Sequence, residues 1–295
     1  MTPAEIRNAP APAKLNLFLH VTGRRADGYH ELETAFQLID LQDLVHLRRR
    51  DDGQITRLNP LPDVPPEQDL TVRAARLLQH HGATTFGVDI GLDKHIPMGG
   101  GLGGGSSDAA TVLMALNRLW GLERPQAELA QLGLALGADV PFFIFGRTAL
   151  ARGVGDLLEP IELPERSFVV IAPPVAVPTA HVFGAADLTR NTPPLKIGGS
   201  LDERIWQGHN DLQPVVLRRY PAVASALAVL SDAARSAGVN PTHARMSGSG
   251  ACVFCPAPSH AIADRIAQHV ARFKVGSVRV CHGLARHPLG SRQVG

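Results

Sequence analysis

The segment of the chain with the clearest chemical meaning is a tract of glycines at residues 99–105. Six of its seven residues are glycine, and Leu102 lies between them. Glycine permits close approach to the backbone and the positive φ angles that turn successive N–H groups toward one point. Ser106, Ser107 and Asp108 follow as the expected N-caps of a helix, whose N-terminus attracts anions. The tract therefore predicts a phosphate-binding loop rather than a flexible linker, because a strand pattern precedes it and a helix pattern follows it.

Two other functional classes are compatible with this glycine tract. Gly99, Gly101 and Gly104 fit the G-x-G-x-x-G pattern of nicotinamide-dependent oxidoreductases, although a run of glycines matches that pattern by accident. That interpretation also needs an acidic residue about 20 positions further on, and Glu123, in a turn, is a poor candidate. The chain contains neither the Gly-Lys dipeptide of a Walker A loop nor the signatures of protein kinases. A nucleotide-binding protein without catalysis is the remaining alternative.

Two further positions combine charged side chains with local patterns that suggest chemistry. Lys14 and Asn16 are two residues apart in an alternating pattern, so they share one face of a strand. Lys14 is a lone cation among apolar residues, and the plain alternative is a surface lysine whose stem covers apolar area. Asp139 precedes a short apolar segment at 140–144, where it either caps a helix or takes part in chemistry.

Five stretches of the chain together resemble the galactokinase, homoserine kinase, mevalonate kinase and phosphomevalonate kinase (GHMP) family. They are Ala13–Leu19, Arg25–Leu32, Pro97–Ala110, Gly137–Phe143 and Met246–Ala251. The resemblance implies a small-molecule kinase that uses ATP as co-substrate together with Mg²⁺. The second and fourth stretches are specific to the family member that phosphorylates the 2-hydroxyl of a cytidine diphosphate-linked polyol. That reaction belongs to the non-mevalonate pathway of isoprenoid biosynthesis.

The resemblance also implies a role for each residue of the predicted site. Lys14 is the expected catalytic lysine, Asp139 the expected general base, and the two are expected to form an ion pair. The ATP phosphates are expected on Pro97, Met98, Gly99, Gly100, Gly101, Leu102, Gly103, Gly104, Gly105, Ser106 and Ser107. The polyol substrate is expected to contact Asn16, Tyr29, His30, Thr179 and Phe183.

The resemblance further predicts what the individual side chains do. Tyr29 and Phe183 would enclose the cytosine, while His30 would hydrogen-bond its edge through the ring or the backbone. A second glycine-rich turn at 247–250 would close against the phosphate loop. No protein ligand for the metal is assigned, and Ser107 is a weak candidate for Mg²⁺. Asp211 is expected to cap the helix that follows it.

Hydrophobic periodicity predicts the elements that must position these residues. Because strands and helices mix without strict βαβ alternation, the predicted class is α+β. The first twelve residues are expected to be a frayed lead. Predicted strands lie at 15–21, 29–39, 44–47, 88–92, 167–172, 243–246, 251–255 and 277–282, and predicted helices at 70–80, 109–120, 125–137, 211–219, 222–237 and 259–272.

A two-domain arrangement follows from the resemblance and from a polar, Gly/Pro-punctuated link around residues 150–165. Residues 1–158 are predicted to form an N-terminal ATP-binding domain with ribosomal-protein-S5-like topology, which includes a left-handed βαβ unit. Residues 159–295 are predicted to form a C-terminal α+β domain on the substrate side. The active site is expected in the cleft between the two domains.

Composition limits the partners and the compartment. Of the 295 residues, 44% are hydrophobic and 19% charged, which predicts a globular protein with sizeable cores. A net charge of +2 and 5% aromatic residues argue against a nucleic-acid partner. Cys252, Cys255 and Cys281 fit a reducing cytoplasm, and the C-x-x-C spacing on a strand would direct its two sulfurs to opposite sides. We expect a cytoplasmic protein without a signal peptide or membrane partner, either a monomer or a weak homodimer.

Overall fold

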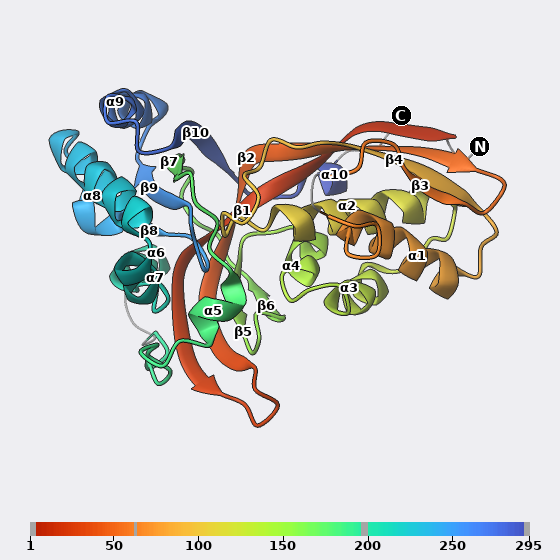
Figure 1. Cartoon of the computed structure of the whole chain (residues 1–295), viewed down its shortest axis with the longest axis horizontal. Helices are drawn as coiled ribbons and strands as arrows, with labels where there is room; N and C mark the ends of the chain where they lie inside the picture. Colours follow the sequence, from red (N-terminus) through yellow and green to blue (C-terminus); the bar gives the residue numbers. More distant parts are fainter. Residues whose placement is uncertain (1–3, 62–63, 196–199, 292–295) are drawn as a thin grey trace.

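The computed structural model describes residues 4–61, 64–195 and 200–291 and shows two groups of helices joined by one long sheet (Figure 1). The first group covers β1–β4, and the second packs on β7–β10 at the other end of the molecule. The first half contains β1 (Glu5–Arg24), β2 (His30–Arg50), β3 (Ile55–Arg57), α1 (Leu70–Gly82), β4 (Gly87–Asp93), α2 (Gly104–Leu119), α3 (Gln126–Leu134), α4 (Val140–Phe145), β5 (Ala149–Arg152) and β6 (Leu157–Pro160). The second half contains β7 (Ser167–Ala172), α5 (Thr179–Phe183), α6 (Leu201–Gln207), α7 (Gln213–Arg219), α8 (Pro221–Ser236), η1 (Pro241–His243), β8 (Arg245–Met246), β9 (Val253–Ala257), α9 (His260–Ala271), β10 (Ser277–Leu284) and α10 (Pro288–Ser291).

The sheet connects the two halves through β2. Its strand order in the described residues is β3-β4-β2-β10-β7-β9-β8, while β1 pairs with β2, and β5 pairs with both β2 and β6. The joint is short, because β10 meets β2 only where Gly283 lies opposite Ile39 and Leu284 opposite Leu38. The long β1–β2 hairpin contributes to the apolar clusters of both halves, through Ala9 and Ala11 in one and Leu19 and Val21 in the other, so it can carry residues of a shared site.

The prediction of a frayed lead at residues 1–12 is wrong for the described part of that segment. β1 begins at Glu5, and the residues from Ala9 to Pro12 are buried. The hydroxyl of Thr111 on α2 donates to the Pro10 carbonyl at 3.2 Å. Small side chains allow α2 to pack closely on this strand. Tertiary packing thus overrides the weak strand preference of alanine and proline.

β1 and β2 are also longer and more buried than the alternating pattern predicts. The two strands predicted at 29–39 and 44–47 are one strand of 21 residues, interrupted in its pairing by a shift near Ile39. Both faces of β1 are covered: Lys14 is 4% exposed, Asn16 2% and His20 4%. The polar residues of the pattern therefore mark a buried polar site and not a solvent face.

The remaining core follows the predicted elements. One apolar cluster joins α1, α2 and α4 to β2 and β4, and a second joins α7, α8 and α9 to β7 and β9. The predicted boundary between residues 158 and 159 falls inside β6, which pairs with β5. The position of the domain boundary stays a prediction.

Candidate active site

The predicted site residues line one cavity of about 1020 Å³, with Ser107 as the exception. The cavity is bounded by β1 and β2, the glycine loop, the start of α4, α5 and the turn at 247–250. Residues more than 100 positions apart, such as Lys14 and Phe183, thus share one space. A cavity of this volume is at the upper end of the range found for small-molecule sites.

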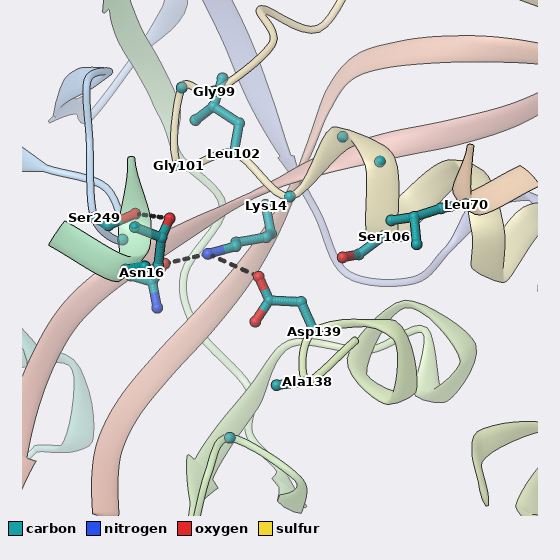
Figure 2. Close-up of a pocket in the computed structure, with 18 of the residues that line it drawn as sticks. Lys14, Asn16, Leu70, Gly99, Gly101, Leu102, Ser106, Ala138, Asp139 and Ser249 are labelled. Atoms are coloured by element: carbon teal, nitrogen blue, oxygen red, sulfur yellow. Dashed lines mark hydrogen bonds and ion pairs between the residues drawn. The ribbon is translucent and has the colours of Figure 1, made fainter. Parts of the chain in front are cut away.

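At the centre of the cavity, Lys14 is held by two oxygen-bearing side chains (Figure 2). Its Nζ donates to Oδ1 of Asn16 and lies 3.4 Å from Oδ2 of Asp139. The Lys14 side chain is 5% exposed, whereas that of Asp139 is 33% exposed. Asn16 is in turn fixed by Thr34, whose hydroxyl accepts from Nδ2 at 3.0 Å. The ammonium is therefore rigid, and the carboxylate beside it remains accessible to a ligand.

Asp139 takes the N-cap position of α4, but its side chain makes no capping hydrogen bond. The alternative that Asp139 caps a helix therefore holds for its backbone position but not for its side chain. With its carboxylate turned toward Lys14 instead of the helix, Asp139 gives up a capping interaction that is typically worth about 1 kcal/mol. A residue placed in this way is available for chemistry.

The glycine loop combines left-handed backbone with a helix N-terminus. Gly99, Gly101 and Gly103 have φ angles of 66°, 73° and 72°, and α2 starts directly afterwards at Gly104. The Lys14 backbone N–H donates to the Leu102 carbonyl at 3.0 Å, which ties the loop to β1. Exposed N–H groups and the positive end of the helix dipole make this an anion-binding site.

The expected N-caps of α2 are wrong, because the helix begins five residues earlier than its apolar pattern predicts. Gly103 is the N-cap, and Ser106, Ser107 and Asp108 lie inside the first turns. The Ser107 hydroxyl donates to the Pro12 carbonyl at 2.7 Å, and its N–H donates to the Gly103 carbonyl. Both donors of Ser107 are therefore used. The residue is fully buried and does not line the cavity.

The turn at residues 247–250 lies against the glycine loop. The Ser247 hydroxyl donates to the Gly101 carbonyl at 3.0 Å and accepts from the Asn16 N–H at 3.2 Å. The Cys252 N–H donates to the Gly100 carbonyl at 3.0 Å. Gly248 comes so close to the site that a Cβ there would lie 3.4 Å from the Lys14 ammonium nitrogen. The turn thus connects the phosphate loop with the central lysine.

Two residues just before α7, Asn210 and Asp211, bind backbone groups of distant segments, and Asn210 supports this turn. Asn210 donates through Nδ2 to the carbonyls of Met246 and Gly248, both at 2.8 Å. Asp211 does not cap the helix as predicted, since α7 begins at Gln213 and the carboxylate accepts from the Val21 N–H at 2.7 Å. Both side chains bind distant backbone, which no local pattern reveals.

A buried ionic cluster, not predicted from the sequence, fixes the entry to the glycine loop. The Lys94 ammonium contacts the carboxylates of Asp43 and, at 2.8 Å, Asp108. Asp43 also accepts the N–H groups of His95 and Ile96. Burial and the neighbouring Asp43 raise the pKa of Asp108 to about 7, although Lys94 opposes the shift. Two buried carboxylates thus share one ammonium beside α2.

We expect Asp108→Asn to stabilise the protein at pH 8, because burial raises the pKa of this carboxyl and its ionised form is disfavoured in the folded protein. The pKa of this carboxyl is 3.8 in the unfolded chain and about 7 in the folded protein. The free energy of unfolding therefore falls as the pH rises between these two values. The amide carries no charge, so it removes that loss. Urea unfolding at pH 8 and pH 5 measures the effect, which should shrink at pH 5. A variant that is less stable than the parent at pH 8 would contradict the prediction.

The other end of the cavity carries the predicted substrate residues. The rings of His30 and Phe183 lie 5.1 Å apart with an angle of 36° between their planes. Tyr29 is 64% exposed at the end of the β1–β2 hairpin. The hydroxyls of Thr179 and Ser249 are 2.7 Å apart. Aromatic faces and hydroxyls at one end suit a flat heterocycle linked to polar groups.

The two cysteines of the C-x-x-C spacing face opposite sides, as predicted. Cys252 belongs to the apolar cluster that contains Phe168 and Phe254, and Cys255 to the cluster under α8 and α9. Burial raises the pKa of both thiols to about 12. Each sulfur therefore serves as a small apolar group in the core.

Two family descriptions match this chain: the GHMP kinases N terminal domain over residues 69–147 and the GHMP kinases C terminal domain over residues 197–275. The chain therefore belongs to the GHMP kinase family, whose members are small-molecule kinases that use ATP as co-substrate. The resemblance and the α+β class predicted from the sequence are confirmed, and the oxidoreductase alternative is wrong.

Within this family, two curated relatives that share a name are similar to this chain over nearly its whole length. It is 52% identical to the 4-diphosphocytidyl-2-C-methyl-D-erythritol kinase of Cupriavidus necator over 293 residues, covering 99% of this chain and 97% of the relative. It is 55% identical to the protein of the same name from Thiobacillus denitrificans over 280 residues, covering 95% and 96%. Sequence similarity thus extends through both halves of the site.

Solved structures of kinases also align with this chain over nearly its whole length. A crystal structure of a 4-(cytidine 5'-diphospho)-2C-methyl-D-erythritol kinase aligns with a TM-score of 0.77 and 36% identity, covering 95% of this chain and 98% of that one. The mevalonate kinase of L. major aligns with a TM-score of 0.69 at 17% identity, which shows a shared fold. No helix in the described residues is long and apolar enough to span a membrane.

Proposed function

We propose that this protein transfers the γ-phosphoryl group of ATP to the 2-hydroxyl of 4-diphosphocytidyl-2-C-methyl-D-erythritol, giving the 2-phosphate and ADP. The reaction belongs to the non-mevalonate pathway of isopentenyl diphosphate synthesis. One observation carries the proposal: the Lys14–Asp139 pair, the glycine loop and the aromatic residues His30 and Phe183 all line a single cavity. The anion site would suit the ATP phosphates, the charged pair the acceptor hydroxyl, and the aromatic residues the cytosine base.

Lys14 and Asp139 would act on the acceptor hydroxyl. The carboxylate of Asp139 would orient that hydroxyl and accept its proton as the bond to phosphorus forms. The ammonium of Lys14 would offset negative charge on the oxygen and on the moving phosphoryl group. Phosphoryl transfer has a loose transition state, so positioning and charge stabilisation account for most of the catalysis.

The glycine loop would hold the ATP phosphates through N–H groups between Gly99 and Ser106. Three apolar side chains that line the cavity, those of Leu61, Leu70 and Leu92, would cover the adenine base of ATP. Mg²⁺ would neutralise phosphate charge when bound. Since the described residues contain no cluster of three ligating side chains, phosphate oxygens and water would supply most of its ligands.

We expect Phe183→Ala to raise KM for the cytidine substrate by about tenfold or more, while KM for ATP changes less than about threefold. Stacking of a base on an aromatic ring is worth roughly 1–3 kcal/mol, and tenfold corresponds to about 1.4 kcal/mol. Steady-state kinetics with each substrate varied in turn measures both constants. Phe273→Ala, an exposed phenylalanine after α9, is the matched control. If KM for ATP rises instead, the two ligand sites are exchanged.

The test of the proposed function is an assay with purified protein, ATP, Mg²⁺ and the cytidine substrate, followed by ³¹P NMR of the products. The expected result is one new phosphomonoester per ADP formed. Free methylerythritol phosphate, which lacks the base, should be a very poor acceptor because remote binding energy positions the reacting hydroxyl. No phosphomonoester with the cytidine substrate would refute the proposal.

We also propose that the protein acts in the cytoplasm on small molecules alone, without a nucleic-acid or membrane partner, as a monomer or weak homodimer. Support comes from the near balance of 29 basic and 27 acidic residues and from three free, buried cysteines. Residues 1–158 would form the ATP-binding domain and residues 159–295 the substrate-side domain. Light scattering over a range of concentrations measures the assembly state.

A further inference from the structure

His30 is a titratable group at the base-binding end of the cavity, and its ring has one hydrogen-bond partner in the described residues. Arg190, in the segment that follows α5, donates from Nε to Nε2 of His30 at 3.1 Å. A guanidinium carries only donors, so Nε2 must be the acceptor in this hydrogen bond. The proton of a neutral His30 ring is then on Nδ1.

Arg190 is itself held firmly in place. Its Nη2 donates to the carbonyls of Phe183 at 3.0 Å and Ala185 at 2.7 Å, and its Nη1 donates to Leu188 at 3.1 Å. The guanidinium thus joins the segment that carries Phe183 to the His30 ring, which lies 5.1 Å from the Phe183 ring. Its orientation is set by three backbone carbonyls and does not depend on the histidine.

The electrostatics favour the neutral ring. Burial lowers the pKa of His30 from its ordinary value of 6.5, and the positive charges of Arg190 and Arg24 lower it further. Within the described part of the chain, no hydrogen bond is made to Nδ1 of His30. The ring therefore has one unused polar atom, a donor, in a residue that lines the cavity.

We propose that Arg190 is a positioning residue that fixes His30 with its proton on Nδ1, so that the base-binding end of the cavity presents a donor and selects cytosine. Cytosine N3 is an acceptor and pairs with such a donor. Uracil carries a proton on N3, which would leave two donors facing each other. A buried polar group without its partner is a strong source of discrimination. This proposal rests on the proposed function for the identity of the base.

The first experiment reads the tautomer in the substrate-free protein. Two-bond ¹H–¹⁵N NMR at pH 8 of ¹⁵N-histidine-labelled protein distinguishes protonated from unprotonated ring nitrogens, and His30→Gln assigns the signal. We expect Nδ1 to be protonated in the parent and in Arg190→Lys, whose ammonium also has only donors. Arg190→Gln, whose amide can accept, should show a mixture of both tautomers. A parent protein with the proton on Nε2 would overturn the proposal.

The second experiment measures selectivity as the ratio of kcat/KM for the cytidine and uridine forms of the substrate. Arg190→Gln should lower this ratio by at least about tenfold with kcat on the cytidine form within about threefold, and Arg190→Lys should retain it. Arg24→Gln is the matched control, because Arg24 affects His30 through charge and makes no hydrogen bond to it in the described structure. An unchanged ratio in Arg190→Gln, or an equal fall in Arg24→Gln, would overturn the proposal.

The two experiments separate the possible failures. If the parent phosphorylates neither nucleotide, the proposed function fails, while the NMR result still decides whether Arg190 sets the tautomer. If the parent is active but His30 carries its proton on Nε2, the function stands and the role of Arg190 is refuted.

Discussion

Replacing Asp139 by asparagine is expected to lower kcat at least about 100-fold, while the Kd for ATP changes less than about threefold. A positioned base typically contributes 10²–10⁴-fold, and an amide keeps the size of the side chain but cannot accept the proton. Asp139 lies 3.4 Å from the Lys14 ammonium and makes no capping hydrogen bond that the substitution would break. Single-turnover kinetics and calorimetry with ATP measure the two quantities.

The control for this change is Asp232→Asn, an exposed aspartate on α8 that is remote from the cavity. It should leave kcat and ATP affinity within about threefold of the parent. A kcat of Asp139→Asn within threefold of the parent would remove this residue from the mechanism. If ATP affinity falls along with kcat, the carboxylate holds the nucleotide complex, and its role as a base is not supported.

The parts of the site that the sequence predicts are those encoded within a few residues. A phosphate loop needs glycines with positive φ next to a helix, and Gly99, Gly101 and Gly103 meet that requirement. Lys14 and Asn16 share a strand face because residues two apart always do. The resemblance then brings Asp139 to the same site, and the structure places these three side chains together.

The parts that the sequence does not predict depend on contacts between distant segments. Asn210 holds the turn at 247–250 through backbone carbonyls, and Arg190 reaches His30 across 160 positions. Such contacts leave no periodic pattern. The start of α2 at Gly104 differs from the predicted start at residue 109, because the glycines that open the helix carry no apolar signal.

One compositional signal could have revealed the cluster around Lys94. The chain contains four lysines against 25 arginines, and two of the four, Lys14 and Lys94, line the cavity. Lysine presents a compact, strongly hydrated charge with three donors, whereas arginine presents a planar guanidinium. Lys94 lies between a strand and the glycine tract, and its rarity as a lysine indicates a functional or structural site there, as it does for Lys14.

The glycine loop and the turn at 247–250 are packed so closely that one added methyl group should separate them. A Cβ on Gly101 would lie 2.2 Å from the Ser247 carbonyl oxygen and 3.0 Å from the Gly250 nitrogen. Both neighbours are backbone atoms, which cannot rotate away as a side chain can. At a φ of +73° the alanine also adds backbone strain, which for a non-glycine residue typically costs about 1–3 kcal/mol.

We therefore expect Gly101→Ala to lower kcat/KM at least about 100-fold and to weaken ATP binding at least about tenfold, because a displacement of about 1 Å in a positioned site has that effect. Gly290→Ala is the matched control, since its Cβ would meet nothing within 4 Å. Ser247→Ala removes one hydrogen bond to the Gly101 carbonyl without adding bulk, so its loss should be smaller. Kinetics, calorimetry with ATP and urea unfolding measure the three variants. If Gly101→Ala keeps kcat/KM within threefold, the contact between loop and turn does not position the phosphates.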